Sequence, residues 1–240
     1  MAGPYEGVTV VDTTGLTGAY ATRLFAGLGA EVIHLEPPQG SALRRLTPFV
    51  ESIDPPESSL WWSYLAMGTH SVVVEPGDTD SMEQVISQAD VLFEDQLPEH
   101  SGVPSELIDS STIRTRILPF GLSGPKRGWK SSNLVAWAGS GILYTTGFTD
   151  RPPVAPAAPV QLACHAAGAS ALVGTLLALR VRRLSGVAQN VEISMQEAAL
   201  TIAPETGVPM LLDDRVHRAV SYTHLRAHET REDRVSRRGG

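Results

Sequence analysis

A pair of glycines near the start of the chain, in the segment Gly15-Leu16-Thr17-Gly18, is the first feature that could bind a ligand. The segment follows a short run of β-branched residues and precedes a run with helical periodicity, so we expect it at the carboxyl end of a strand. Backbone N–H groups at such a turn can bind a phosphate or another polar group. The alternative is a structural loop that needs the glycines only for its backbone shape.

The dinucleotide fingerprint G-x-G-x-x-G is absent from this turn, which argues against a nicotinamide-dependent enzyme. Glu36 nevertheless stands about twenty residues further on, where such proteins carry a ribose-binding acid. A nucleotide-like ligand therefore fits the turn, and an NAD-dependent oxidoreductase remains a remote alternative.

The elements around the turn predict a parallel βαβ unit. Val8, Val10 and Val11 are typical of a buried strand, residues 19–28 place an apolar stripe on one side of a helix, and residues 31–36 return as a strand. The alternation continues, with strands expected at 71–75, 89–94, 112–119 and 190–193 and helices at 80–88, 163–183 and 197–202. We therefore predict an α/β fold, a Rossmann-like, open, mostly parallel sheet with flanking helices.

The composition fits a globular domain with a substantial core and excludes several classes of protein. The chain has 240 residues, 42% of them hydrophobic, and a net charge of −7, with only two lysines among its 19 basic residues. No basic stripe for nucleic acid can be drawn on such a chain. The longest apolar stretch, residues 166–179, is shorter than the roughly twenty residues that a bilayer requires.

The cysteine content and the first residues indicate the compartment. A single cysteine excludes an internal disulfide and a cysteine-built metal site, so we expect no metal. The start of the chain has neither the basic residues nor the apolar run of a secretory signal. We therefore expect a cytoplasmic protein with no membrane partner.

Several motifs, in order along the chain, resemble those of one family. They are residues 11–40 (VDTTGLTGAYATRLFAGLGAEVIHLEPPQG), Ala89-Asp90-Val91 with Phe93-Glu94-Asp95, residues 120–125 (FGLSGP), residues 138–141 (AGSG), residues 145–148 (TTGF) with Pro152-Pro153, and residues 183–195 (RLSGVAQNVEISM). Together they resemble the family III CoA-transferases, the CaiB/BaiF group that includes formyl-CoA transferase, carnitine CoA-transferase and α-methylacyl-CoA racemase.

The resemblance implies CoA transfer between an acyl-CoA thioester and a small carboxylic acid, with coenzyme A or acyl-CoA as the substrate. It also implies a second, smaller domain, which is absent here, and a homodimer whose subunits interlock. We therefore expect a truncated large domain over residues 1–214, working as such a homodimer or with a partner that supplies the other half.

The last residues differ in composition from this domain. Residues 221–240 contain five arginines, two histidines and three acids, with almost no apolar periodicity. They could form a basic arm. A non-native read-through fits better, because the resemblance stops before them without reaching a natural domain end. We expect residues 215–240 to be a non-homologous tail that is artefactual or disordered.

The resemblance further implies a catalytic aspartate at the start of the long helix, and counting back from Gly168 leads instead to Cys164. In one interpretation, the helix dipole lowers the pKa of the Cys164 thiol, which accepts the acyl group with help from His165. Adjacent helical residues point about 100° apart, which places His165 poorly as a base. In the other interpretation, Cys164 is a small buried residue.

The positions that the resemblance assigns to CoA binding fall into four groups. They are Leu16, Thr17 and Gly18 in the glycine turn; Arg44 and Arg45 after the Pro-Pro turn; Thr69 and His70, where the family has Lys-Arg; and Asp95 and Gln96, where it has Asn-Phe. At the last two groups this chain lacks cations or donors that the family has. Ligand binding by the backbone of the glycine turn, in contrast, does not depend on the identity of the side chains. The positions of the racemase acid–base pair hold Ser132 and Asn133, neither of which is a base.

Two functions of different classes therefore remain. The first is family III CoA transfer with Cys164 at the catalytic position. The second is a catalytically inactive CoA-binding or scaffold half of a tandem or heteromeric CoA-transferase. The missing aspartate favours the inactive half.

Overall fold

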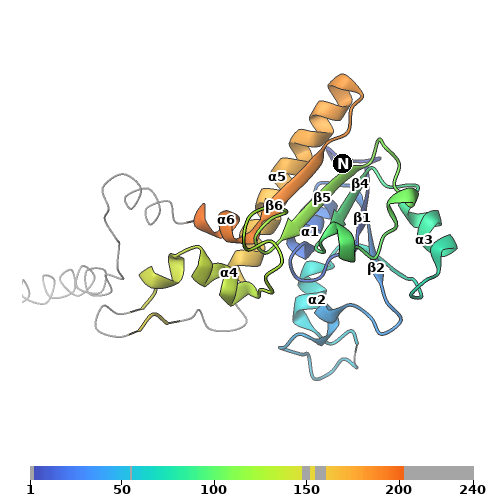
Figure 1. Cartoon of the computed structure of the whole chain (residues 1–240). Helices are drawn as coiled ribbons and strands as arrows, with labels where there is room; N and C mark the ends of the chain where they lie inside the picture. Colours follow the sequence, from blue (N-terminus) through green and yellow to red (C-terminus); the bar gives the residue numbers. More distant parts are fainter. Residues whose placement is uncertain (1–2, 55, 148–151, 155–160, 203–240) are drawn as a thin grey trace, which may run out of the picture.

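A single sheet of six parallel strands forms the centre of the molecule (Figure 1). The computed structural model describes residues 3–54, 56–147, 152–154 and 161–202. The strands are β1 (Thr9–Asp12), β2 (Glu31–Glu36), β3 (His70–Val73), β4 (Val91–Glu94), β5 (Ile113–Leu118) and β6 (Asn190–Ser194), in the spatial order β3-β2-β1-β4-β5-β6. The predicted α/β class, an open parallel sheet with flanking helices, is confirmed.

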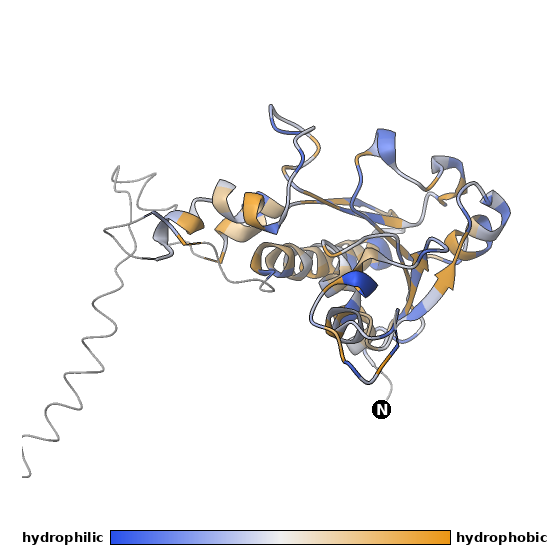
Figure 2. Cartoon of the chain, turned by 90° about the horizontal axis from the view of Figure 1, so that it is seen from below, coloured by the Kyte–Doolittle hydropathy of each residue, from blue (hydrophilic) through white to orange (hydrophobic). Residues whose placement is uncertain are grey.

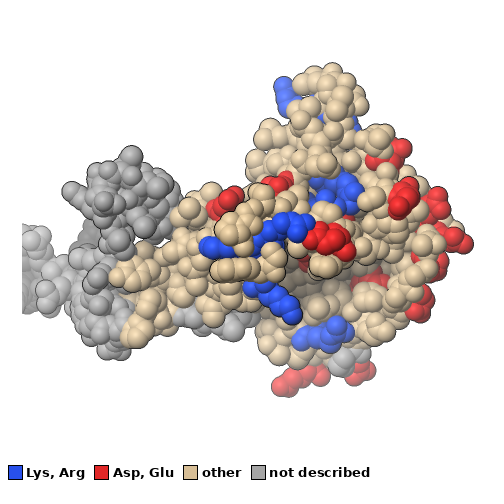
Figure 3. All heavy atoms as spheres, in the orientation of Figure 1, with Lys and Arg blue, Asp and Glu red and all other residues tan. Residues whose placement is uncertain are grey.

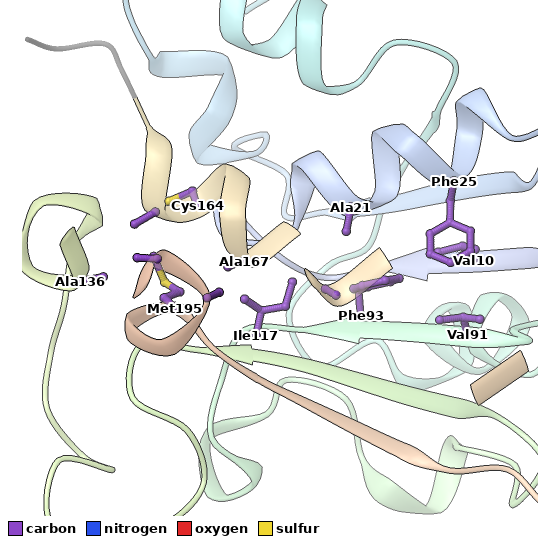
Figure 4. Close-up of a cluster of buried hydrophobic side chains, with 14 of the residues drawn as sticks. Val10, Ala21, Phe25, Val91, Phe93, Ile117, Ala136, Cys164, Ala167 and Met195 are labelled. Atoms are coloured by element: carbon purple, nitrogen blue, oxygen red, sulfur yellow. The ribbon is translucent and has the colours of Figure 1, made fainter. Parts of the chain in front are cut away.

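Helices cover both faces of this sheet. They are α1 (Ala19–Gly27), α2 (Leu60–Leu65), α3 (Thr79–Ile86), α4 (Asn133–Gly139), α5 (Leu162–Ser185) and α6 (Met195–Leu200). Successive strand residues point to opposite faces. Val10 therefore packs in a cluster with Phe25 of α1 and Ala171 of α5, while Val11 packs in a second cluster with Ile86 of α3. Figure 4 shows the first cluster, and Figure 1 shows α3 on the side opposite to α1 and α5.

The long helix α5 supplies much of the first cluster. By length and composition it could cross a membrane, yet eight of its residues are buried inside the domain. In Figure 2 hydrophobic residues mark the strands and α5, whereas the connecting loops are largely hydrophilic or neutral. The buried side of α5 therefore forms part of the core of the domain. Gly186 ends the helix in a left-handed conformation, with φ 74°, which glycine adopts without strain.

The sequence patterns located most of these elements to within a few residues. The helix predicted at 163–183 is observed as Leu162–Ser185, and the strand predicted at 112–119 as Ile113–Leu118. The helix predicted at 197–202 begins earlier, at Met195, because the Ser194 side chain caps it by accepting from the amide of Glu197. The short helices α2 and α4 were not predicted. The proposed domain end at residue 214 and the tail at 215–240 lie outside the described residues.

Gly168 sets the distance between α1 and α5. A Cβ atom there would lie 2.9 Å from Cβ of Tyr20 and 3.0 Å from the backbone nitrogen of Ala21. We predict that Gly168→Ala lowers the free energy of unfolding by about 1 kcal/mol, because overpacking (about 1–3 kcal/mol) outweighs the gain in helix propensity (about 1 kcal/mol).

Urea denaturation measures this change in unfolding free energy. Gly27→Ala is the matched control, since a Cβ atom at Gly27 on α1 would have nothing within 4 Å. A Gly168→Ala protein as stable as the wild type would contradict the proposed close contact.

Candidate functional site

A pocket of about 1000 Å³ lies at the carboxyl ends of β1, β4, β5 and β6. Its walls come from the turn after β1, the segment after β4, the loop between β5 and α4, and the first turns of α4 and α5. Open parallel sheets bind ligands outside the carboxyl ends of their strands. The pocket is therefore the candidate site.

Several of the predicted site residues meet in this pocket. Those that line it are Leu16, Thr17, Asp95, Gln96 and Cys164. The parallel pairing of β1 with β4 brings the segments after the two strands to one edge of the sheet. Gly18 is buried beside them, and a Cβ atom there would lie 2.2 Å from Oγ1 of Thr14. The turn therefore requires glycine for a structural reason as well.

A buried carboxylate holds the turn from below. Asp12, at the end of β1, accepts hydrogen bonds from the amide of Thr14 (2.8 Å) and from the hydroxyls of Thr14 (2.7 Å) and Thr22 (2.8 Å). The Nδ1 atom of His34 lies 3.1 Å from the same carboxylate. Burial alone would raise the pKa of Asp12, but His34 and the two donors of Thr14 hold it below the usual value. Asp12 thus fixes the backbone that leads into the pocket.

A second carboxylate is bound to the turn from the side. The Oδ2 atom of Asp95 accepts from the backbone amide of Gly15 (2.9 Å) and from the hydroxyl of Thr17 (2.8 Å). The side chain of Gln96 lies 3.3 Å from the other oxygen of Asp95. The sequence indicated that Asp95 and the turn belong to one site, but not that Asp95 occupies donors of the turn itself.

Cys164 lies in the first turn of α5 and is only 4% exposed. Figure 4 shows it with Met195 and Ala136 at one end of the buried cluster. Burial raises the pKa of its thiol to about 12, the opposite of the lowering expected from the helix dipole. Desolvation of the thiolate is the cause of the raised pKa, and the thiol is protonated at neutral pH. These facts support the interpretation of Cys164 as a small buried residue.

His165 points away from Cys164, toward an aromatic group on another side of α5. Its ring lies 4.6 Å from the ring of Tyr20 and 5.9 Å from that of Trp61, measured between centroids. Its Nδ1 atom lies 2.7 Å from the carbonyl oxygen of Gln161. His165 is therefore not placed to take a proton from Cys164.

Arg44 is held by carboxylates rather than presented to the pocket. Its guanidinium donates to both oxygens of Glu36, at 2.6 and 2.7 Å, and also bonds Glu57. It stacks on the ring of Trp62 at 3.6 Å from the centroid. Arg45 donates to the carbonyl of Gln39 at 3.0 Å. Neither arginine is among the residues that line the pocket.

The carboxylate of Glu36 is fully engaged. Besides Arg44, it accepts from the amide of Ser41 at 2.5 Å and from the hydroxyl of Ser71. Burial alone would raise its pKa, but these donors lower it to about 2. Glu36, whose position in the sequence matches that of a ribose-binding acid, thus has a structural role. This role weakens the alternative of an NAD-dependent oxidoreductase.

Thr69 and His70 also lie outside the pocket lining. The Thr69 hydroxyl donates to the carbonyl of Ala66 at 2.8 Å and lines a much smaller cavity of about 10 Å³. His70 begins the edge strand β3 with an exposed side chain. These two positions do not join the rest of the predicted site.

One segment of the pocket wall, which is cationic and aromatic, was not predicted from the sequence. Arg127, Trp129 and Lys130, in the loop before α4, line the pocket. Arg127 forms an ion pair of 2.7 Å with Glu99, which lines it as well. Figure 3 shows basic side chains over the middle of this face, with acidic ones beside them. The sequence feature that could have indicated this segment is the position of both lysines of the chain, Lys126 and Lys130, on either side of Trp129.

The two positions of the racemase pair act as helix caps. Ser132 caps α4 by accepting from the amide of Val135 at 3.3 Å. Asn133 reaches α5 instead, where its Oδ1 atom accepts from the amides of Ala163 (2.9 Å) and Cys164 (3.3 Å). The first turn of α5 is thereby already provided with an acceptor.

We predict that the hydrogen bonds and the ion pair of the Glu36 carboxylate contribute to the free energy of unfolding in a way that depends on pH. The carboxylate's folded pKa of about 2 lies below the ordinary value of 4.5. The contribution is therefore complete above pH 4.5 and is lost as the pH falls from 4.5 toward 2. We expect Glu36→Gln to destabilise the protein at pH 6 and to flatten the dependence of unfolding free energy on pH below 4.5.

Urea titrations between pH 3 and pH 6 measure this dependence. Glu75→Gln, at an exposed acid after β3, is the control and should leave the dependence unchanged. Equal slopes for Glu36→Gln and the wild type would contradict the assignment.

Because the thiol of Cys164 is buried, we predict that it reacts slowly with a disulfide reagent. We expect less than about a tenth of the thiol to react with a disulfide reagent at pH 8 in the time that a denatured sample reacts fully, because the thiolate is scarce and covered. Absorbance of the released thiolate measures the rate. Fast reaction of the folded protein would mean that the thiol is accessible and ionised.

The family model of CoA-transferase family III matches residues 5–236. Over 207 residues the chain is 32% identical to succinyl-CoA:(R)-benzylsuccinate CoA-transferase subunit BbsE of Thauera aromatica, covering 82% of this chain and 50% of that protein. Over 212 residues it is 32% identical to formyl-CoA:oxalate CoA-transferase of Streptomyces avermitilis, covering 84% and 50%. The chain thus spans about half the length of the curated relatives it matches.

Solved structures share the fold. A CAIB/BAIF family protein from Brucella suis superposes with a TM-score of 0.82 at 21% identity, over 91% of this chain and 60% of that one. Rv3272 from Mycobacterium tuberculosis superposes with a TM-score of 0.76 at 27% identity, over 88% and 60%. The family model extends over nearly all of the sequence, and on that match the chain belongs to CoA-transferase family III.

Proposed function

We propose that this chain binds an acyl-CoA thioester in the pocket at the ends of β1, β4, β5 and β6, as the large domain of a CoA-transferase. The observation that carries the proposal is the composition of that one pocket. Its walls combine the glycine turn, two cationic side chains and Cys164, the residue to which the family resemblance assigns the position of the catalytic aspartate. The relatives transfer CoA between an acyl-CoA and an acid, as their names state.

The charges of the pocket wall suit a polyanionic ligand held by few cations. Lys130 is exposed at the pocket wall, and Arg127 is shared with Glu99. Both can bind phosphate oxygens, Arg127 after releasing Glu99. Trp129, 59% exposed in the same wall, offers an apolar surface. We assign Lys130 and Arg127 to the phosphates of the ligand.

The chemistry of transfer is not supported at Cys164. Attack on a thioester would form an S-acyl cysteine and release CoA as its thiol, the proton passing from Cys164 to the leaving sulfur. A thiol whose pKa is about 12 provides only a minute fraction of thiolate at neutral pH. We propose that the chain binds CoA while the reacting carboxylate comes from another polypeptide segment or subunit.

Direct acyl transfer through Cys164 is the second candidate function. It is favoured by one observation, that Cys164 lines the same pocket as the glycine turn. It requires the pKa of the thiol to fall when a ligand enters.

We further propose that the large domain, residues 1–214, works with a covering partner, either a second copy or a complementary half. The outer side of α5 exposes Val173 (57%), Leu177 (59%) and Leu184 (75%), spaced as one stripe of the helix. BbsE, by its name, is a subunit. Exposed apolar stripes of this kind mark protein interfaces.

The two lysines of the chain allow a matched test of the CoA site. Lys130 lines the pocket, whereas Lys126 contacts Gln196 and the rings of Phe120 and Trp129 and is not among the lining residues. We predict that Lys130→Gln weakens CoA binding about three- to tenfold, as loss of one charge-assisted phosphate contact should. Lys126→Gln removes the same charge and should change binding less than about twofold.

Isothermal titration calorimetry with CoA and acetyl-CoA measures both dissociation constants. Binding of CoA that is indifferent to Lys130 would contradict the assigned phosphate contact. Absence of CoA binding to the wild-type chain would contradict the proposed function itself.

A further inference from the structure

One wall of the pocket already contains an anion. The carboxylate of Asp95 accepts from the amide of Gly15 and the hydroxyl of Thr17, at 2.9 and 2.8 Å. Within the described residues, the amides of Leu16, Thr17 and Gly18 donate to no protein atom. Backbone donors of such a turn are what a ligand phosphate or carboxylate would use. Asp95 therefore holds part of an anion-binding turn from within the protein.

Among the residues that the structure describes, no cation pairs with the carboxylate of Asp95. Its partners are an amide, a hydroxyl and the side-chain amide of Gln96, all neutral. Other acids nearby are paired: Glu99 with Arg127, and Glu94 with Arg114 and Arg116. A like charge brought to the turn would thus meet an uncompensated carboxylate.

The cations of the pocket come from a different segment than Asp95, and one of them, Arg127, is paired with Glu99 of the segment after β4. Arg127 and Lys130 belong to the loop between β5 and α4, whereas Asp95 follows β4 and bonds to the turn after β1. An anionic ligand is therefore attracted by the side chains of Arg127 and Lys130 and repelled by the carboxylate of Asp95. Neutral amides and hydroxyls can still donate to Asp95.

We propose that Asp95 is a specificity-determining residue that excludes anionic ligand groups from the glycine turn and confines them to the wall of Arg127 and Lys130. The proposal deepens the proposed function and rests on it for the identity of the ligand. Groups at the turn are then uncharged, such as the amides and hydroxyl of a pantetheine arm, whose oxygens can accept from the turn amides and whose N–H and O–H groups can donate to Asp95. The repulsion from Asp95 lowers the affinity of the pocket for a polyanion, and it favours a single orientation of the bound polyanion.

The variant Asp95→Asn tests this role, because asparagine keeps an oxygen that can accept from Gly15 and Thr17 but removes the charge. The matched control is Glu106→Gln, an exposed acid in the connection between β4 and β5 that does not line the pocket. It makes the same change in net charge. Both proteins are first checked for thermal unfolding. Asp95→Ser, with a small neutral acceptor, replaces the asparagine variant if that one does not fold.

Calorimetric titration uses three probes: CoA, inorganic pyrophosphate and uncharged pantetheine. We expect Asp95→Asn to bind CoA and pyrophosphate about tenfold more tightly than the wild type at low salt. The gain should shrink to less than about twofold at 0.5 M salt, because screening weakens the repulsion. Pantetheine affinity should not rise, and Glu106→Gln should behave as the wild type.

The outcomes separate this proposal from the function on which it rests. Equal gains in Asp95→Asn and Glu106→Gln would overturn it as an effect of net charge, and unchanged or weaker binding of both anions would overturn it as well. If pyrophosphate binding rises while CoA binds to neither protein, the role of Asp95 stands and the CoA function fails.

Discussion

The parallel pairing of β1 with β4 is the constraint on which the site depends. It places Val10 beside Val91 and Asp12 beside Phe93, so that the segments after the two strands emerge together. Because β1 and β4 are almost entirely buried, a shift of register by one residue would turn every side chain to the wrong face. The glycine turn and Asp95 meet at the pocket as a consequence.

The fold was largely predictable because its signals are local. The β-branched run of β1, the apolar run of β4, and the long apolar helix α5 ended by Gly186 follow directly from the sequence. Helices α2 and α4 were missed because six or seven residues carry too little periodicity and their serine caps resemble ordinary loop residues. Local pattern therefore identified the sheet, but not the short elements packed around it.

The site was predictable only in part, because side-chain partners depend on tertiary contacts. Leu16, Thr17 and Asp95 line one pocket as a shared site requires. Arg44 was a candidate phosphate ligand, yet Glu36 and Glu57 already bind it. For Cys164, position on the helix suggested a lowered pKa, whereas the surrounding core raises it to about 12. Burial could not be weighed against the dipole before the packing of α4 and α6 was known.

We propose that the domain retains a pocket that can bind CoA, while Cys164 in the first turn of α5 is a protonated thiol that does not react. Intact-mass spectrometry after mixing the chain with acetyl-CoA and succinyl-CoA at pH 7, followed by peptide mapping, tests it most directly. We predict no acyl adduct on Cys164 under conditions in which calorimetry detects CoA binding. An adduct that maps to Cys164 and disappears in Cys164→Ser would contradict the claim and establish thiol-based acyl transfer.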